Sequence, residues 1–405
     1  MAARGPTNVL LRPSRGGDGT RVSYVELFYD LVFVFAITQI AHDLVARQDL
    51  ATLGQILLLT AAMWWLWVET AWLTNWLNPD HPAVRTMLFA LMLLGLVIAS
   101  AIPEAFGDKA ALFAVSFAVS LVGRGVFAVL AFRRSRPDHV RNFLRLTIWS
   151  PTASVFWIAG GFGSEEARPW LWCIALAINM LAPVVRFRVP VLDASPPETW
   201  DVAGEHLAER VSLFIIIVLG EAIILTGVAF AAVPLDLMGA LAFLAAFTST
   251  VLMWLLYFNH AQAGGSRYIR DSATPGMIAR LAYTFVPVLL VIGILLTAVA
   301  DELVLLDPFG GGTSGSSGFT AALICGAPAI YLVGNAVFDR AIGRPWMRAH
   351  LVGATILVVL VAAFAVLPPI ALSWIANLVL LLVVVAEDRV DRRVTRAGAP
   401  SGSSA

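Results

Sequence analysis

The chain is organised as long apolar runs that are separated by short polar segments. A bilayer core about 30 Å thick requires about 20 apolar residues of helix. The pattern therefore predicts an all-α integral membrane protein with about twelve transmembrane helices, of which the sixth and eleventh are the shortest. The predicted spans lie near 25–45, 53–73, 83–102, 111–132, 140–158, 168–186, 207–232, 235–258, 277–299, 319–338, 351–366 and 370–386.

Composition supports this interpretation. Of the 405 residues, 59% are hydrophobic and 13% are charged. A soluble domain carries roughly 25% charged residues, so the surplus of apolar side chains here must face something other than water. We therefore expect the lipid bilayer to be the partner of these surfaces. The first run contains acidic residues and has no small-residue cleavage site behind it. We expect it to be a retained membrane anchor rather than a removed signal peptide.

The basic residues predict the orientation of the helices. With a cytoplasmic N-terminus and twelve crossings, 22 of the 27 basic residues fall in cytoplasmic segments and three fall in external loops. The positive-inside rule favours this arrangement. Both termini are therefore expected in the cytoplasm. Formal net charge is zero and the basic residues are scattered, so nucleic acid is not an expected partner.

The two halves of the chain resemble each other. Residues 121–127 read LVGRGVF and residues 332–338 read LVGNAVF, and further matches follow in the same order in both halves. Because each half has six spans, the sequence predicts two parallel six-helix repeats. The expected parts are a cytoplasmic tail at 1–22, a first repeat at 23–190, a linker at 191–205, a second repeat at 206–388, and a tail at 389–405 that is disordered at its end. A flexible external loop is expected at 310–318.

Seven ionisable residues of the predicted spans are candidates for a functional site. A charge at the bilayer centre costs about 2.5–3.5 kcal/mol, so such residues usually face the bundle interior and pair. In one interpretation the arginines simply neutralise the acids, and the set is structural. In the other, the set binds or moves a cation or proton. The seven residues are Glu26, Asp30, Glu69, Arg124, Glu209, Arg210 and Glu221.

Two acids are the strongest candidates for coupling to an ion. Glu221 is expected near the midplane, and the nearest basic residue of its own helix, Arg210, is roughly 16 Å away along the helix axis. Asp30 lies on one face of the first span together with Glu26, because the two are four residues apart. Replacing Glu221 by Gln is expected to abolish function without loss of expression.

Motifs of common enzymes are missing. The chain has no phosphate-binding G-x-x-x-x-G-K-[ST] loop, no H-E-x-x-H and no G-x-S-x-G. His206 and Glu209 share a helical face, but a third ligand is missing from the pattern, so no metal centre is expected. We expect no cofactor and no enzymatic activity. The tryptophans of the second span are expected in packing and an interfacial belt, with a ligand-stacking wall as the alternative.

Two stretches carry a family resemblance. Residues 26–39, ELFYDLVFVFAITQ, resemble the first signature of the bacterial low temperature requirement protein A (LtrA) family, and residues 209–221, ERVSLFIIIVLGE, resemble its second. The resemblance implies a multi-spanning protein of the bacterial inner membrane but supplies no reaction. It marks Glu26, Asp30, Glu209, Arg210 and Glu221 as motif positions.

A secondary transporter of a small solute, coupled to protons or cations, is the function that the sequence favours. Residues 28–30, FYD, are similar to the F-S-D motif of potassium channels built from six-helix repeats, so a cation channel assembled as a homodimer is the first alternative. The second half has no matching F-S-D, which counts against conduction. A membrane component of a cold or envelope stress response that transports nothing is the second alternative.

Overall fold

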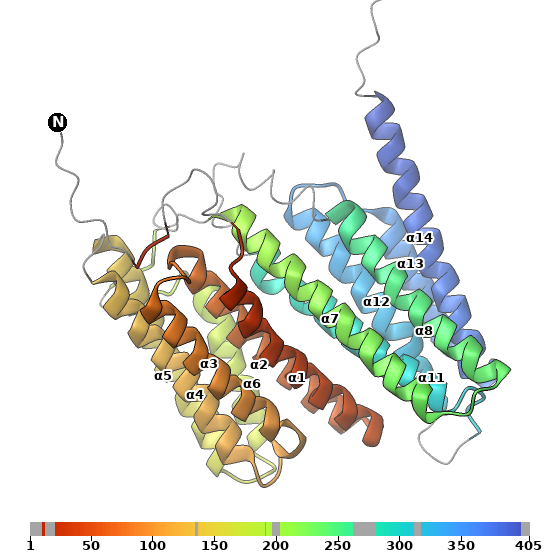
Figure 1. Ribbon diagram of the computed structural model, residues 1–405, viewed down its shortest axis with the longest axis horizontal. Coiled ribbons are helices and arrows are strands. Elements are labelled where there is room, and N and C mark those ends of the chain that lie inside the picture. Colours follow the sequence, from red (N-terminus) through yellow and green to blue (C-terminus); the bar gives the residue numbers. More distant parts are fainter. Residues whose placement is uncertain are drawn as a thin grey trace, which may run out of the picture. The chain divides into compact units, whose positions relative to one another are not determined.

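The computed structural model describes residues 10–12, 21–133, 137–190, 192–196, 203–261, 281–311 and 317–397. These residues form helices and no strands, apart from two isolated β-bridges. Each of the twelve predicted spans coincides with a helix, shown in Figure 1. The prediction of an all-helical protein is therefore confirmed.

Ten helical segments among the described residues are long and apolar enough to cross a membrane. Two of the twelve predicted spans are not among them. Helix α6 has 17 residues and is therefore roughly 25 Å long, shorter than a bilayer core. Helix α5 has 26 residues but carries Arg141 and Arg145 in its first half and three hydroxyl residues just after its middle. The count of twelve, the orientation and the repeat stay predictions.

The chain divides into two compact units. The first unit comprises Met1–Glu221 and Tyr268–Val288. Its elements are α1 (Tyr24–Ala46), α2 (Leu50–Trp76), α3 (Pro82–Ala101) with the short turn η2 (Ile102–Glu104), α4 (Ala110–Phe132), α5 (Pro137–Phe162), α6 (Arg168–Val184), the larger part of α7 (Gly204–Ala232), and the π-helical turn η5 (Leu281–Phe285).

Small residues bring the helices of the first unit into close contact. A Cβ atom added at Gly161 of α5 would lie 2.5 Å from the Cβ of Ala114 on α4 and 3.0 Å from the carbonyl oxygen of Ala110. Beside this contact, four rings from α4, α5 and α6 pack together, with centroids 4.5–6.1 Å apart. These rings belong to Phe113, Phe117, Trp157 and Trp172. Helix–helix packing in membranes depends on this close approach, because lipid provides no hydrophobic drive between helices.

The second unit comprises Ala222–Arg267 and Leu289–Ala405. Polar contacts tie its helices together, since Tyr331 donates to the carbonyl of Met253 at 2.7 Å and Asn377 donates to the carbonyl of Ala245 at 2.8 Å. Its elements are α8 (Leu237–Leu256), η4 (Tyr257–Ala261), most of α11 (Pro287–Leu306), α12 (Ser317–Ala341), α13 (Arg348–Leu360), η6 (Val361–Ala365) and α14 (Pro369–Ala397).

Several predicted segments can be compared with the structure only in part. Helix α14 continues to Ala397, so residues 389–397 are helical where a tail is predicted. The predicted disordered end at 398–405 lies outside the described residues, as do 312–316 of the predicted external loop and most of the tail at 1–22. Residues 10–12 are described and contact the end of α2, where the backbone N–H of Arg12 donates to the carbonyl of Trp76 at 2.9 Å.

We predict that Gly161→Ala destabilises the protein. The new methyl group meets a backbone carbonyl, which cannot move aside cheaply, so overpacking should cost about 1–3 kcal/mol. Thermal unfolding of the purified protein in detergent measures the effect. Gly123→Ala is the matched control, because nothing lies within 4 Å of a Cβ at that position and the helix should gain up to about 1 kcal/mol. Equal unfolding temperatures for the two variants would contradict the packing described.

Candidate functional site

A buried ion pair joins α1 to α7 in the first unit. The guanidinium of Arg210 donates two hydrogen bonds to the carboxylate of Asp30, each 2.9 Å long. The indole N–H of Trp67 on α2 donates a third at 2.7 Å. Neither charged side chain is exposed. The Asp30 carboxylate thus accepts three N–H hydrogen bonds from the protein in place of water.

The geometry of this pair makes it strong and directional. A bidentate arginine–carboxylate pair uses two parallel N–H···O bonds, which fix the orientation of both groups. The guanidinium carbon of Arg210 also lies 5.4 Å from the centroid of the Trp67 ring, within cation–π distance. Trp67 therefore contacts both partners, and Phe214 of α7 packs on the same ring with centroids 4.3 Å apart. Of the two interpretations of the charged set, this pair fits the one in which the arginines neutralise the acids.

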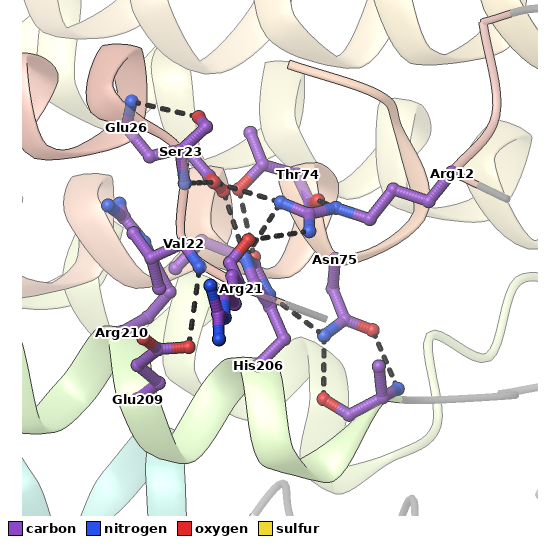
Figure 2. Close-up of polar contacts among 12 residues, drawn as sticks. Arg12, Arg21, Val22, Ser23, Glu26, Thr74, Asn75, His206, Glu209 and Arg210 are labelled. Carbon is purple, nitrogen blue, oxygen red and sulfur yellow. Dashed lines mark hydrogen bonds and ion pairs between the residues drawn. The ribbon is translucent and has the colours of Figure 1, made fainter. Parts of the chain in front are cut away.

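A second cluster surrounds Glu26, one turn before Asp30. Arg12 donates to one carboxylate oxygen at 2.8 Å, and His206 Nε2 lies 3.1 Å from the other. Arg12 Nη2 lies 2.8 Å from the same His206 nitrogen. Figure 2 shows Arg12, from the segment before α1, and His206, from the first turn of α7, converging on Glu26. Glu26 and His206 are both fully buried.

The start of α1 is held by a reciprocal cap. Ser23 caps the helix through its side chain, and the Glu26 carboxylate accepts from the Ser23 backbone N–H at 2.9 Å. This arrangement is a capping box, which satisfies two helix-terminal donors at once. Glu209 lies nearby and accepts from the backbone N–H of Val22 at 3.3 Å. Glu26 and Glu209 therefore anchor the chain that enters α1.

A third charged pair links α2 to α4. Arg124 forms an ion pair with Glu69, and it also donates to the Leu66 carbonyl at 3.1 Å and to the Thr70 hydroxyl at 3.2 Å. Tyr29 of α1 donates to the same hydroxyl at 3.0 Å. Arg124 is buried, whereas the Glu69 side chain is 15% exposed. The acid of this pair therefore reaches a surface that a solute could contact.

That surface is the wall of a cavity of about 400 Å³. Its walls are mainly aromatic and apolar, with the Glu69–Arg124 pair on one side. Clefts of roughly 300–1,000 Å³ with a few polar groups are typical of small-molecule sites. The aromatic lining residues are Trp65, Trp72, Trp76, Phe143 and Phe187, and all of the lining belongs to the first unit.

Two residues in a left-handed conformation shape the end of this cavity. Helix α6 ends in a Schellman motif, in which Phe187 N–H donates to the Ala182 carbonyl at 2.7 Å and Arg186 N–H donates to the Pro183 carbonyl at 3.1 Å. Glycine is usual at the position that Arg186 occupies. Arg186 has φ 55° and Phe187 has φ 51°, and both line the cavity.

A buried arginine holds the loop that follows. Arg145 of α5 donates through Nε to the carbonyls of Leu192 and Asp193, each at 3.1 Å, and through Nη1 to the side chain of Asn142 at 2.8 Å. The backbone N–H of Ser195 donates to the carbonyl of Arg186 at 2.9 Å. The cavity wall is therefore fixed by several hydrogen bonds.

Glu221 lies apart from these clusters, in the middle of α7. The Thr38 hydroxyl of α1 lies within hydrogen-bond distance of both the Glu221 carboxylate and the Val34 carbonyl of its own helix, and its single proton can go to either. No basic side chain forms an ion pair with Glu221 in the part of the chain that the structure describes. Arg210, on the same helix as Glu221, pairs with Asp30 instead.

The structure brings together most of the predicted site residues, but in three groups. Asp30 pairs with Arg210, Glu69 pairs with Arg124, and Glu26 and Glu209 anchor the start of α1. Glu221 is separate. Four partners of the charged groups are not predicted from the sequence: Arg12, Thr38, Trp67 and His206. Of these, only Trp67 has a signal in the sequence, because it belongs to the tryptophan-rich second span.

Comparisons with known proteins agree with the two signatures. The sequence profile described as "Bacterial low temperature requirement A protein (LtrA)" matches residues 21–385. An uncharacterised protein of Rhizobium meliloti strain 1021 is 36% identical over 388 residues, which cover 94% of this chain and 92% of that protein. No solved structure matches the chain significantly.

We predict that Arg210→Gln strongly destabilises the first unit, because it leaves the Asp30 carboxylate buried without its cation. Breaking a buried pair in this way costs about 3–5 kcal/mol. The double variant with Asp30→Asn should recover a large part of the loss. Thermal unfolding in detergent measures both. Arg47→Gln, which removes a half-exposed partner of Asp43, is the control and should cost at most about 1 kcal/mol.

Proposed function

The chain belongs to the bacterial low temperature requirement A family, and we propose that it is a secondary transporter of a small solute in the bacterial inner membrane. The proposal rests on the cavity in the first unit, with its aromatic walls and the Glu69–Arg124 pair. A cavity of this size, lined by aromatic side chains and a few polar groups, has the usual features of a small-molecule site.

The composition of the wall suggests how a solute binds. Indole rings of Trp65, Trp72 and Trp76 offer flat apolar surfaces on which a planar or cationic group can stack. Glu69 offers a carboxylate that is already paired, so an incoming cation or proton competes with Arg124 for it. Binding of solute and release of Arg124 would then be linked through one acid.

Glu221 is the residue that we assign to ion coupling. Its described polar partner is a hydroxyl, which can donate to the charged carboxylate or accept from the protonated one. Both carboxylate oxygens of Asp30, in contrast, already accept hydrogen bonds from Arg210, and one of them also accepts from Trp67. We therefore narrow the coupling candidates from both acids to Glu221.

The pairing of Asp30 also bears on the channel alternative. A cation that permeates past FYD at 28–30 would meet a carboxylate whose oxygens both accept from Arg210. The arginine would repel the ion and would have to leave a buried, hydrogen-bonded position. This arrangement favours a carrier over an open cation pathway along that face of α1.

We predict that Glu221→Gln abolishes coupled proton flux, because glutamine cannot exchange a proton. The purified protein is reconstituted into liposomes that contain a pH-sensitive dye, and a panel of small organic amines and neutral aromatic solutes is added outside. At least one solute should drive proton movement in the unaltered protein, with at least a ten-fold lower rate in the variant. Glu104→Gln, in an exposed turn, is the control. The same solute-driven proton flux in Glu221→Gln would remove this residue from the mechanism.

We also predict that Ala128→Phe blocks transport by filling the cavity. Ala128 is buried on α4 and lines the cavity, so a phenyl group there takes the place of solute. Leu130→Phe is the matched control, because Leu130 lies on the same helix and is 52% exposed. Solute-driven flux should fall at least ten-fold in the first variant only. If both variants transport equally, while unfolding temperatures show that both are folded, the cavity is not the solute site.

A further inference from the structure

Three ionisable side chains meet in the second unit, far along the chain from the residues discussed so far. Asp339 lies near the end of α12, His350 in the first turn of α13, and Glu387 on α14. All three are at most 2% exposed. One potential ligand atom from each lies within 4.8 Å of the other two, and His350 Nε2 is 3.2 Å from a Glu387 oxygen.

The turn between α12 and α13 and the close approach of α13 to α14 bring these three residues together. Helix α12 ends in a Schellman motif, in which Gly343 takes φ 80° and the Arg344 N–H donates to the Asp339 carbonyl at 3.0 Å. This turn leads directly into α13. A Cβ added at Gly353 would lie only 2.6 Å from a Val383 methyl. Gly353 and Val383 are about one helical turn from His350 and Glu387, so the glycine lets α13 approach α14 where the ligands meet.

The donor set is that of a transition-metal site. One imidazole nitrogen and two carboxylates match the mixed nitrogen and oxygen ligands of Zn²⁺, Mn²⁺ or Fe²⁺, whereas Mg²⁺ and Ca²⁺ prefer oxygen alone. Bonds of about 2.1 Å to each ligand place ligand atoms roughly 3–3.5 Å apart. The ligand atoms now lie within 4.8 Å of one another, so the side chains would have to close in on a bound ion.

We infer that Asp339, His350 and Glu387 together bind one divalent transition-metal ion. Three protein ligands leave at least one coordination position for water or another ligand. Two carboxylates balance the charge of a dication when the imidazole is neutral. Arg344, which pairs with Asp339 at 3.1 Å and is about one-third exposed, adds one positive charge beside the site.

The competing arrangement contains no metal. In it, a protonated His350 pairs with Glu387 while Arg344 pairs with Asp339. Both arrangements satisfy the carboxylates, but they respond differently to added metal. The metal site lies in the second unit and does not depend on the proposed transport, whose cavity and coupling residue belong to the first.

The test uses the full chain, purified in detergent without a histidine tag and stripped with a chelator. Zn²⁺ and Mn²⁺ are titrated by calorimetry, and bound metal is counted by elemental analysis after desalting. We expect about one ion per chain and a higher unfolding temperature with the ion bound. Less than 0.1 ion per chain, on the order of background, would overturn the inference.

Variants locate the ion. His350→Gln and Glu387→Gln should each weaken binding at least ten-fold. Asp301→Asn is the matched control, since Asp301 is a buried acid of the same unit that accepts from Ser249 at 2.7 Å. Unchanged affinity in a folded His350→Gln protein places the metal elsewhere.

X-ray absorption of the Zn²⁺-loaded unaltered protein identifies the ligands of the metal even if these variants fail to fold. We expect nitrogen and oxygen scatterers with one imidazole. A sulfur scatterer or two imidazoles would overturn the assignment, because the proposed site has one histidine and no cysteine.

Discussion

A charge inside an apolar helix bundle must be paired, and this constraint orders the first unit. Buried carboxylates there meet a cation or several N–H donors, as Asp30 meets Arg210 and Trp67, with Glu221 and its hydroxyl partner as the exception. Because each pair joins different helices, the pairs fix which helices are neighbours. Asp30 ties α1 to α7, and Arg124 ties α4 to α2. Lipid gives no hydrophobic reason for one neighbour over another, so polar contacts and close packing carry that information.

Much of the fold follows from the sequence, because spanning helices must be apolar along their whole length. The apolar runs locate all twelve helices, including α5 and α6, whose membrane-spanning character is weaker. Because a charge inside the membrane is costly, Asp30, Arg124 and Arg210 are also recognisable from the sequence as residues that need partners. The partners themselves were harder to find. Nothing in the pattern of residues 1–22 indicates that Arg12 folds back onto Glu26, since that contact depends on the path of the chain before α1.

The cluster in the second unit illustrates the same limit. Asp339 and His350 lie near helix ends, and Glu387 lies one residue beyond the predicted span at 370–386, so none of the three appears as a charge inside a predicted span. Sequence reasoning gives such residues little weight. Their meeting depends on a glycine turn at Gly343 and on the close approach at Gly353, which no periodicity of apolar residues encodes. The resulting site is visible only once three helices are placed together.

The left-handed pair at the end of α6 has a consequence for how this cavity can change during evolution. Such a conformation costs roughly 1–2 kcal/mol per residue for a side chain other than glycine, asparagine or aspartate. Glycine at position 186 or 187 would relieve that cost and would leave the helix cap intact. Arginine and phenylalanine stand there instead, and both side chains line the cavity. The loop is thus less stable than it would be with glycine, and in return it keeps the Arg186 and Phe187 side chains beside the cavity. A relative with glycine at either position should therefore bind a different range of solutes in this cavity.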